Sequence, residues 1–494
     1  MDQIQIDQLR GLSVPEQGLF IDGKTCKALK GGTRDVVSPL DGTILTRLAE
    51  AEENDIDLAV ASARASFDRG SWSKAAPAER KKVMHRIADL IEKNALELAV
   101  LGVRDNGTEI SMAIKAEPGS AANTFRYYGE LIDKVYGEIA PTTGSVLGLI
   151  HHEPVGIVGV IVPWNFPMMI GAWKIAPALA AGNSVVVKPA EVASLTLLRL
   201  AEICSEAGLP PGVFNVVTGQ GSVVGAALGL HNDVDVLAFT GSGAVGRKLL
   251  EYSARSNLKR VYLELGGKSP NIVFADAPDL DQAAKMAAYG IFRNSGQVCV
   301  AGSRLLVERA IHGDFARKVT EFASKMRLGD PLDLNTEAGA IVSGDQLSKN
   351  LEFVTRAKAE GASLLTGGTR IREETGGFFM APTVFDQVAP DSVIAQEEVF
   401  GPVLAITPFE DEAAAVRIAN STIYGLASGV WTSNLSRAHR MVRAIRAGVV
   451  HVNTYGGPDI TVPLGGVGQS GNGHDKSPHA LEKFLNLKSA WIQL

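Results

Sequence analysis

A cysteine in a glycine-rich setting is the first candidate for chemistry in this chain. Cys299 lies in NSGQVCVAGSR, where Gly296 and Gly302 keep the surrounding backbone open to an approaching substrate. A thiolate in such a place can act as a nucleophile. The alternative is an inert buried cysteine that serves as a small hydrophobe, which is the commoner case. Cys26, in a polar segment, and Cys204, on an amphipathic helical stretch, are predicted to be structural.

A glutamate and an asparagine can supply the other groups of such a reaction. Glu264, in LELGGKSP, ends an apolar run, so burial should raise its pKa toward the range of a general base. A salt bridge to a nearby lysine is the alternative. Asn165, in VPWNFP, follows a buried run between two prolines. Its amide can donate to an oxyanion or can simply form a turn.

Two places in the sequence can bind a dinucleotide. GSGAVG at 241–246 follows the run VDVLAFT and matches G-x-G-x-x-G, and Glu264 lies about twenty residues further on, where a ribose-binding acid is expected. SVVVKPAE offers a second place, because Lys188 ends a buried strand and Glu191 follows it. If the carboxylate of Glu191 accepts hydrogen bonds from the ribose hydroxyls, Glu264 is left for another role.

The segments around these residues alternate between strand-like and helix-like patterns, as in α/β proteins. Strand-like runs that are apolar throughout are separated by helix-like segments, which indicates parallel sheets buried on both faces. The first set is VGIVGVIV, SVVVK, VFNVVT and VDVLAFT; the second begins with VYLELGGKSPNIVFA and continues through RLLVER, EEVFGPVLAITPF, ASGVWT and GVVHVN. We therefore predict two α/β domains joined near residue 260.

The flanking segments are predicted to be extended at both ends of the chain. The first fifty residues have the texture of hairpins or irregular strands, and a helical pattern starts near Glu53. Residues 147–155 resemble part of an extended ribbon. The C-terminal AWIQL is predicted to be a strand that needs a partner sheet edge, for which another subunit is one source.

Composition excludes several classes of protein. The 494 residues carry 48 Lys and Arg against 54 Asp and Glu, a net charge of −6, which excludes a generally basic surface for nucleic acid. With 46% hydrophobic residues the chain is not disordered. Three cysteines fit a reducing compartment, no signal-like N-terminus is visible, and prolines interrupt the longest apolar region, 154–187. We expect a cytoplasmic protein without a membrane span.

Six motifs occur in an order and spacing that identify a family. They are PWNFP (163–167), KPAE (188–191), FTGS (239–242), LELGGKSP (263–270), GQVCVAG (296–302) and EEVFGPV (397–403). With them, nearly the whole chain resembles the NAD(P)-dependent aldehyde dehydrogenase superfamily. The resemblance implies a Rossmann-type cofactor domain, an α/β catalytic domain and a small β oligomerisation element. The implied boundaries are 1–134 and 156–262 for the NAD-binding domain, 263–455 for the catalytic domain, and 135–155 and 477–494 for the bridging strands.

The resemblance also implies roles for individual residues. Cys299 becomes the nucleophile, Glu264 the general base, and Asn165 an oxyanion donor together with the Cys299 backbone N–H. The residues implied at the cofactor are Trp164, Lys188, Glu191, Gly241, Ser242, Val245, Glu398 and Phe400. The residues implied around the substrate are Phe166, Met169, Trp173, Arg293, Val298, Val300 and Tyr455. No metal is expected.

The implied reaction is the NAD-dependent, irreversible oxidation of an aldehyde to a carboxylic acid through a cysteine thiohemiacetal and thioester. Glu264 favours hydrolysis, since the coenzyme-A-acylating branch lacks that base. Glu191 favours NAD, because the 2′-phosphate of NADP would face a carboxylate. The expected partners are a small aldehyde and copies of the same chain, as a dimer or tetramer. A catalytically silent NAD-binding relative is the contrasting class, and the retained Cys299, Glu264 and Asn165 argue against it.

The substrate is predicted from weaker hints. The tail QSGNGHDKSPHALEKF resembles the branch that acts on ω-amino, guanidino and γ-glutamylamino aldehydes, and Trp173 fits an aromatic wall facing a cationic substrate. Arg293, in FRNSGQVC, instead resembles the carboxylate-binding arginine of succinate-semialdehyde dehydrogenases, or it is simply salt-bridged. Leu464 and Gly468 replace a usual Phe and Lys, and GHD at 473–475 replaces G-R-E. These departures are expected to affect subunit packing and substrate entry more than the chemistry.

Overall fold

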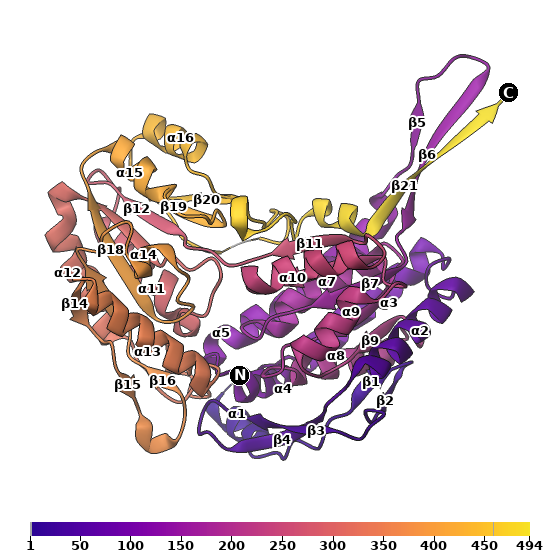
Figure 1. The fold of residues 1–494 in the computed structure, drawn as a ribbon, viewed down its shortest axis with the longest axis horizontal. Coiled ribbons are helices and arrows are strands. Elements are labelled where there is room, and N and C mark those ends of the chain that lie inside the picture. Colours follow the sequence, from indigo (N-terminus) through magenta and orange to yellow (C-terminus); the bar gives the residue numbers. More distant parts are fainter. Residues whose placement is uncertain (1, 458) are drawn as a thin grey trace.

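The computed structural model describes residues 2–457 and 459–494, which form two α/β halves and a protruding arm (Figure 1). The first half is built on a seven-stranded sheet in the order β11-β10-β7-β8-β9-β1-β2. The strands from β11 to β9 are parallel, and β1 and β2 add an antiparallel hairpin at one edge. The strands are β1 (Leu19–Ile21), β2 (Lys24–Cys26), β7 (Ile157–Ile161), β8 (Ser184–Lys188), β9 (Phe214–Val216), β10 (Val236–Thr240) and β11 (Arg260–Glu264).

Helices cover both faces of the first sheet, as its wholly apolar strands predict. Val158 and Val160 of β7 are buried in one hydrophobic cluster, whereas Ile157 and Ile161 are buried in another, because successive strand residues point to opposite faces. The surrounding helices are α2 (Glu53–Arg69), α3 (Pro77–Lys93), α4 (Ala95–Asn106), α5 (Ile110–Ile114), α6 (Ser120–Leu131), α7 (Pro167–Ala180), α8 (Leu195–Glu206), α9 (Ala226–Leu230) and α10 (Gly243–Arg255).

The N-terminal region differs from the prediction at its start. A helix, α1 (Gln3–Arg10), precedes the strands there. The Asp2 side chain caps it by accepting from the Gln5 N–H, and Ile6 is fully buried, so capping and packing outweigh the polar composition. The predicted hairpin texture is confirmed beyond α1, where β3 (Thr33–Val37) pairs with β4 (Ile44–Ala49) in a separate sheet.

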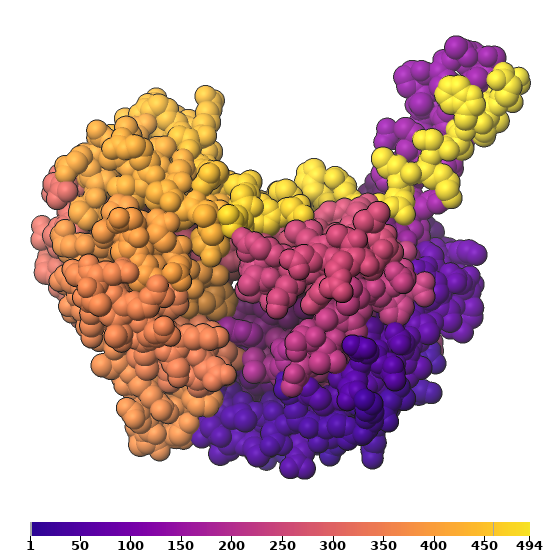
Figure 2. Space-filling view, in the orientation of Figure 1, coloured from indigo at the N-terminus to yellow at the C-terminus, as the bar shows by residue number. Residues whose placement is uncertain are grey.

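The second half repeats the α/β arrangement. Its seven-stranded sheet has the order β14-β17-β18-β13-β12-β19-β20, parallel except for the β14–β17 pair. Figure 2 shows a hollow between the two halves. The strands are β12 (Pro270–Val273), β13 (Arg304–Glu308), β14 (Ser363–Thr366), β17 (Thr383–Asp386), β18 (Val403–Phe409), β19 (Ala427–Trp431) and β20 (Val449–Val452), with the small pair β15 (Arg370–Ile371) and β16 (Phe379–Met380) beside them. The helices are α11 (Leu280–Phe292), α12 (His312–Lys325), α13 (Gly344–Ala359), α14 (Val393–Gln396), α15 (Glu412–Ala419) and α16 (Leu435–Ala444).

The crossing between the halves lies later than the boundary placed after residue 262. Strand β11 continues to Glu264 and pairs with β10 along its whole length, so it belongs to the first sheet. The chain returns to this strand near its end, where Gly471 forms a bridge with Glu264 and the Asn472 side chain accepts from the Leu263 N–H. Sequence periodicity could not show where the chain passes from the first sheet to the second, because the residues on both sides of the crossing are similarly apolar.

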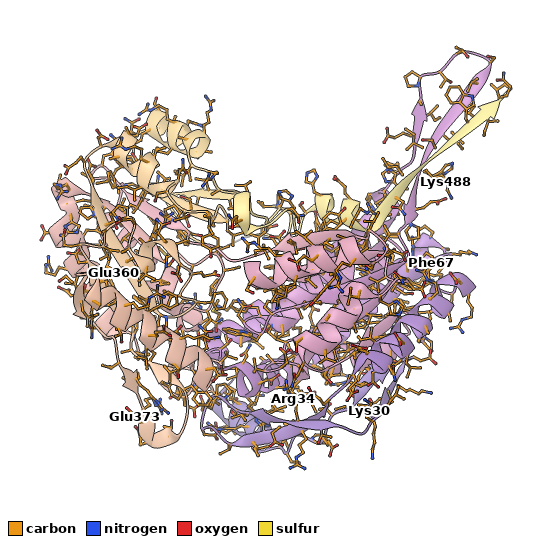
Figure 3. The ribbon with its side chains drawn as sticks, viewed as in Figure 1. Lys30, Arg34, Phe67, Glu360, Glu373 and Lys488 are labelled. Carbon is orange, nitrogen blue, oxygen red and sulfur yellow. The ribbon has the colours of Figure 1, made fainter. Side chains whose placement is uncertain are left out.

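The arm is a three-stranded sheet in the order β21-β6-β5. The predicted C-terminal strand is present as β21 (Leu485–Gln493), and its partner is β6 (Val146–Pro154) of the same chain, with β5 (Glu138–Ala140) on the other side. Lys488, labelled on the arm in Figure 3, pairs with Glu153 across the two strands. Residues 478–484 form a 3₁₀ helix, η8, rather than the predicted strand. No helix in the described part of the chain is long and apolar enough to cross a membrane.

Candidate active site

Both halves contribute the three candidate catalytic residues. Asn165 lies in the loop between β7 and α7, Glu264 is the last residue of β11, and Cys299 follows the short helix η4 (Arg293–Gly296). The Asn165 side-chain amide donates to the carbonyl of Gln297 at 2.9 Å, two residues before the cysteine. Gly267 packs so closely that an added Cβ would lie 2.8 Å from the Cys299 carbonyl oxygen. The fold therefore brings the three predicted residues to one place.

The turn before Cys299 has an uncommon backbone. Asn294 and Ser295 have φ of 49° and 51°, and Gly296 has φ of 71°. Non-glycine residues are held in this region only where the surroundings fix them. Here Asn294 accepts from the Thr108 hydroxyl at 2.8 Å, and Ser295 donates to the Gly339 carbonyl at 2.8 Å. These contacts with both halves fix the position of the thiol.

The Cys299 thiol is in an environment that favours its protonated form. Burial, followed by the charges of Glu398 and Glu264, raises the pKa of Cys299 to about 12. In this state the thiol is protonated at neutral pH, so a reaction at Cys299 needs a group that takes its proton. The charges of Glu398 and Glu264 act on the thiol, which makes these two carboxylates the candidates for that group.

Glu264 has the properties expected of a general base. It is buried, and burial together with the charge of Asp475 raises the pKa of Glu264 well above its ordinary value, while Lys174 and Lys483 oppose the shift. Its Oε1 atom accepts no hydrogen bond from the described part of the chain. The predicted rise in pKa is confirmed, and no salt bridge occupies this carboxylate among the described residues. An uncommitted oxygen of this kind can accept the proton of a water molecule.

A buried ion cluster lies in electrostatic contact with Glu264. Asp475 pairs with Lys174 of α7 and with Lys483 of η8, the latter at 2.6 Å, and all three residues are buried. Sequence analysis missed this cluster and assigned the GHD departure to subunit packing and substrate entry more than to the chemistry. The structure instead places Asp475 where its charge acts on Glu264. The available signal was Lys174, a lone charge in the apolar helix PMMIGAWKIAPALA, since a buried charge needs a partner.

The structure separates the two possible ribose acids. Lys188 is buried at the end of β8, and its Nζ lies 3.0 Å from Glu191 Oε1, which also accepts from the Gly221 N–H. Glu264 gives only its backbone to the glycine-rich turn, because the Gly241 N–H donates to the Glu264 carbonyl at 3.1 Å. Its side chain lies in the field of the Asp475 cluster. Of the two candidate acids, Glu191 is the one beside Lys188, and its ribose role stays a prediction.

Further predicted cofactor residues come from loops of both halves. Ser242 caps α10 by accepting from the Val245 N–H at 3.4 Å. Glu398 accepts from the Gly267 N–H at 2.9 Å, and burial raises its pKa to about 7. Trp164 and Phe400 pack edge to face with their ring centroids 5.2 Å apart. A helix N-terminus and two carboxylates at the edge of a parallel sheet suit the phosphates and ribose hydroxyls of a dinucleotide.

Comparison with known proteins decides the family. The aldehyde dehydrogenase family matches residues 27–490. The chain belongs to the aldehyde dehydrogenase family. It is 48% identical over 479 residues to the Escherichia coli NADP/NAD-dependent aldehyde dehydrogenase PuuC, covering 97% of this chain and 96% of the other. The structure of the aldehyde dehydrogenase KauB from Pseudomonas aeruginosa is 50% identical, with a TM-score of 0.98 and full coverage of both chains. The γ-glutamyl-γ-aminobutyraldehyde dehydrogenase structure from Burkholderia cenocepacia is 49% identical, also with a TM-score of 0.98 and full coverage of both.

The aldehyde dehydrogenase is thus an oxidoreductase, and its fold confirms the predicted α/β class. The residues predicted around the substrate lie on several elements. Phe166 precedes α7, which carries Met169 and Trp173, whereas Val298 and Val300 flank Cys299. Tyr455 is buried and its hydroxyl donates to the Val300 carbonyl at 2.8 Å, which places its ring beside the thiol-bearing turn.

Two of these residues have charged neighbours from the chain itself. The Lys476 Nζ lies 5.6 Å from the centroid of the Trp173 ring, so a cation of the protein already faces this aromatic wall. Arg293 has its Nε 3.8 Å from Glu109 Oε1, and its side chain is 43% exposed while Glu109 is fully buried. Arg293 therefore forms the salt bridge that was the alternative to a substrate-binding role, although its side chain is still partly exposed to solvent.

Proposed function

We propose that this aldehyde dehydrogenase uses NAD to oxidise a small aldehyde to its carboxylic acid through a thioester on Cys299. The single observation that carries the proposal is the meeting of Cys299, Glu264 and Asn165 at one place, with Glu264 and Glu398 both in electrostatic contact with the thiol. A silent NAD-binding protein would have no need of a buried base with an uncommitted oxygen.

The residues act in sequence on the aldehyde. A neighbouring carboxylate, that of Glu398 or Glu264, takes the proton of the Cys299 thiol and passes it to solvent. The thiolate attacks the carbonyl carbon, and the negative oxygen that forms accepts hydrogen bonds from the Asn165 amide and the Cys299 N–H. NAD supplies the hydride acceptor when it is bound by Trp164, Lys188, Glu191, Gly241, Ser242, Val245, Glu398 and Phe400. The acyl group then remains on Cys299 as a thioester. Glu264 takes a proton from water, and the resulting hydroxide releases the acid.

The carboxylate of Glu191 supports NAD over NADP. It lies beside the Lys188 ammonium, and its side chain is 34% exposed, so it is accessible to a ribose. A 2′-phosphate at that position would place like charges together, which costs binding free energy. Two ribose hydroxyls, in contrast, can both donate to the carboxylate.

An ω-amino or γ-glutamylamino aldehyde is the proposed substrate, as for the B. cenocepacia relative named above. A carboxylate-bearing semialdehyde such as succinate semialdehyde is the second candidate, favoured by the partly exposed Arg293 guanidinium. We place the enzyme in the cytoplasm because of its cysteine usage. We also propose a homo-oligomer, dimer or tetramer, that uses the arm, where Leu487 and Trp491 are 69% and 73% exposed.

A panel of aldehydes tests the proposed function. The purified enzyme is supplied with NAD and with succinate semialdehyde, 4-aminobutyraldehyde, γ-glutamylaminobutyraldehyde, betaine aldehyde or an uncharged aliphatic aldehyde, and NADH absorbance is followed. Turnover of at least one aldehyde with stoichiometric acid formation is expected. If neither NADH nor NADPH forms with any aldehyde, in parallel assays with NAD and with NADP, the result would contradict the proposed function and favour a catalytically silent NAD-binding relative.

A further inference from the structure

Lys476 is a buried lysine for which the proposed reaction has no use. The residue is only 1% exposed. Its neighbour in sequence, Asp475, is already held by Lys174 and Lys483. Across residues 2–457 and 459–494, the Lys476 ammonium makes neither an ion pair nor a hydrogen bond, and it faces the Trp173 ring. A buried ammonium without a bound anion is costly, because desolvation is not repaid by a partner.

The backbone holds Lys476 in this position. Lys476 and Ser477 have φ of 66° and 52°, a region that non-glycine residues adopt rarely. Ser477 is fixed on both sides, since its N–H donates to the Ile460 carbonyl at 2.7 Å and its carbonyl accepts from the Tyr128 hydroxyl at 3.0 Å. Two successive strained residues kept in place by such bonds indicate that the direction of the Lys476 side chain matters.

A chain of contacts leads from Lys476 to the nucleophile. The charge of Lys476 lowers the pKa of His451, in addition to the effect of burial. The His451 ring lies 5.6 Å from the Tyr455 ring, and the Tyr455 hydroxyl donates to the carbonyl of Val300, the residue after Cys299. On the opposite side Lys476 faces Trp173, on the helix that begins directly after Asn165. The ammonium therefore lies on the substrate side of the site, away from Lys188 and Glu191.

We propose that Lys476 binds a carboxylate at the far end of the aldehyde substrate, which narrows the proposed substrates from ω-amino aldehydes to the carboxylate-bearing γ-glutamylamino aldehydes. The inference rests on the proposed function and names the substrate class of the same site. Burial lowers the pKa of Lys476 to about 8, while Asp459 and Asp475 oppose the shift, so the side chain is mostly charged at neutral pH. Arg293 is the weaker candidate for this role because the buried Glu109 carboxylate already lies beside it.

The position of Lys476 favours a long substrate. Trp173 lies six residues after Pro167, the first residue of α7, which corresponds to roughly 9 Å of helix beyond the Asn165 loop. Three bonds of extended chain cover roughly 3.5 Å, so about eight bonds or more span this length between the aldehyde carbon and a carboxylate at Lys476. The carboxylate of a γ-glutamylamino aldehyde lies at about this separation from its aldehyde carbon by the same rise per bond. The carboxylate of succinate semialdehyde lies far closer, so this aldehyde is too short to reach the lysine.

The test compares aldehydes of equal, long chain length that end in a carboxylate, a methyl group or an ammonium. Lys476→Met is expected to lower the carboxylate-to-methyl ratio of kcat/KM at least about tenfold, as the loss of a hydrogen bond between charged groups predicts, mainly through KM. The ammonium-to-methyl ratio should rise in the same variant. Lys476→Arg should restore part of the carboxylate preference, and Lys358→Met, an exposed lysine on α13, should leave both ratios as in the wild type.

Three results would overturn the inference. The first is a carboxylate-to-methyl ratio of kcat/KM that does not change in Lys476→Met, and the second is a ratio that falls in Arg293→Met but not in Lys476→Met. The third is a wild-type enzyme that prefers the ammonium aldehyde. Should Lys476→Met fail to fold, inhibition of the wild type decides: a long alkyl carboxylate must inhibit more strongly than the matched alcohol, and equal inhibition overturns the inference. Failure of the proposed function looks different, since the wild type would then form no NADH from any of the three aldehydes.

Discussion

On the cofactor side of Cys299 two carboxylates accept hydrogen bonds from backbone amides, whereas on the substrate side a lysine faces an aromatic ring. Glu191 and Glu398 accept from the N–H groups of Gly221 and Gly267. Lys476 faces an aromatic ring instead. The two carboxylates predicted to bind the cofactor are therefore held in place by backbone N–H groups. The group that would select the substrate depends on a single side chain, which a substitution can change without altering the cofactor site.

The largest loss of activity should come from substitution of Cys299, which lies between the cofactor side and the substrate side. Cys299→Ala is expected to lower kcat/KM for aldehyde oxidation on the order of 10⁴-fold or more, because no covalent intermediate can form. NAD should still raise the thermal unfolding midpoint of the variant, since Glu191 and Ser242 are untouched. Cys26→Ala, in the hairpin strand β2, is the matched control and should keep its activity. Activity that survives in Cys299→Ala would assign the chemistry to another group.

Glu264→Gln should separate the formation of the thioester on Cys299 from its hydrolysis. Acylation of Cys299 by an activated ester should still give a burst, while turnover falls roughly 10²–10⁴-fold because water is no longer deprotonated. In the wild type, hydrolysis should quicken as pH rises through the raised pKa of Glu264, since the base acts only when it is deprotonated. The variant should lose this limb of the pH profile. A variant that keeps both the limb and its turnover would show that another base acts.

Glu191→Gln should give the smallest effect and tests the cofactor side alone. Removal of the carboxylate relieves repulsion of a 2′-phosphate, so the NADP-to-NAD ratio of kcat/KM should rise about tenfold. The ratio among different aldehydes should not move, because Lys476 is unaltered. Glu206→Gln, an exposed carboxylate just beyond Cys204 on α8, is the control. A change in aldehyde preference would contradict the independence of the two sides.

The sequence predicted most of the fold because its strands are apolar on both faces. The run SVVVK appears as β8 and the first residues of VYLELGG appear in β11, and the three catalytic candidates come together as the motifs indicate. The crossing after Glu264 was placed too early because one apolar run spans the end of the first sheet and the start of the second. The helix α1 was missed because its burial depends on one residue, Ile6.

The electrostatics of the site could not be predicted in the same way. The pairing of Lys174 with Asp475 joins positions 301 residues apart, and no local pattern shows such a contact. Asp475 and Lys476 are adjacent in the sequence, yet one enters the ion cluster beside Glu264 and the other faces Trp173. Only the strained backbone at 476 and 477 separates their directions, and that strain depends on tertiary hydrogen bonds.

The most direct test of the account is the covalent state of Cys299 in Glu264→Gln. The variant is mixed with NAD and an aldehyde that the wild type oxidises, quenched in acid, and analysed by peptide mass spectrometry. The account predicts an acyl group on the peptide that contains Cys299, with about one equivalent of NADH formed per active site. An acyl group on Cys26 or Cys204, or NADH formation without any acylated cysteine, would contradict it.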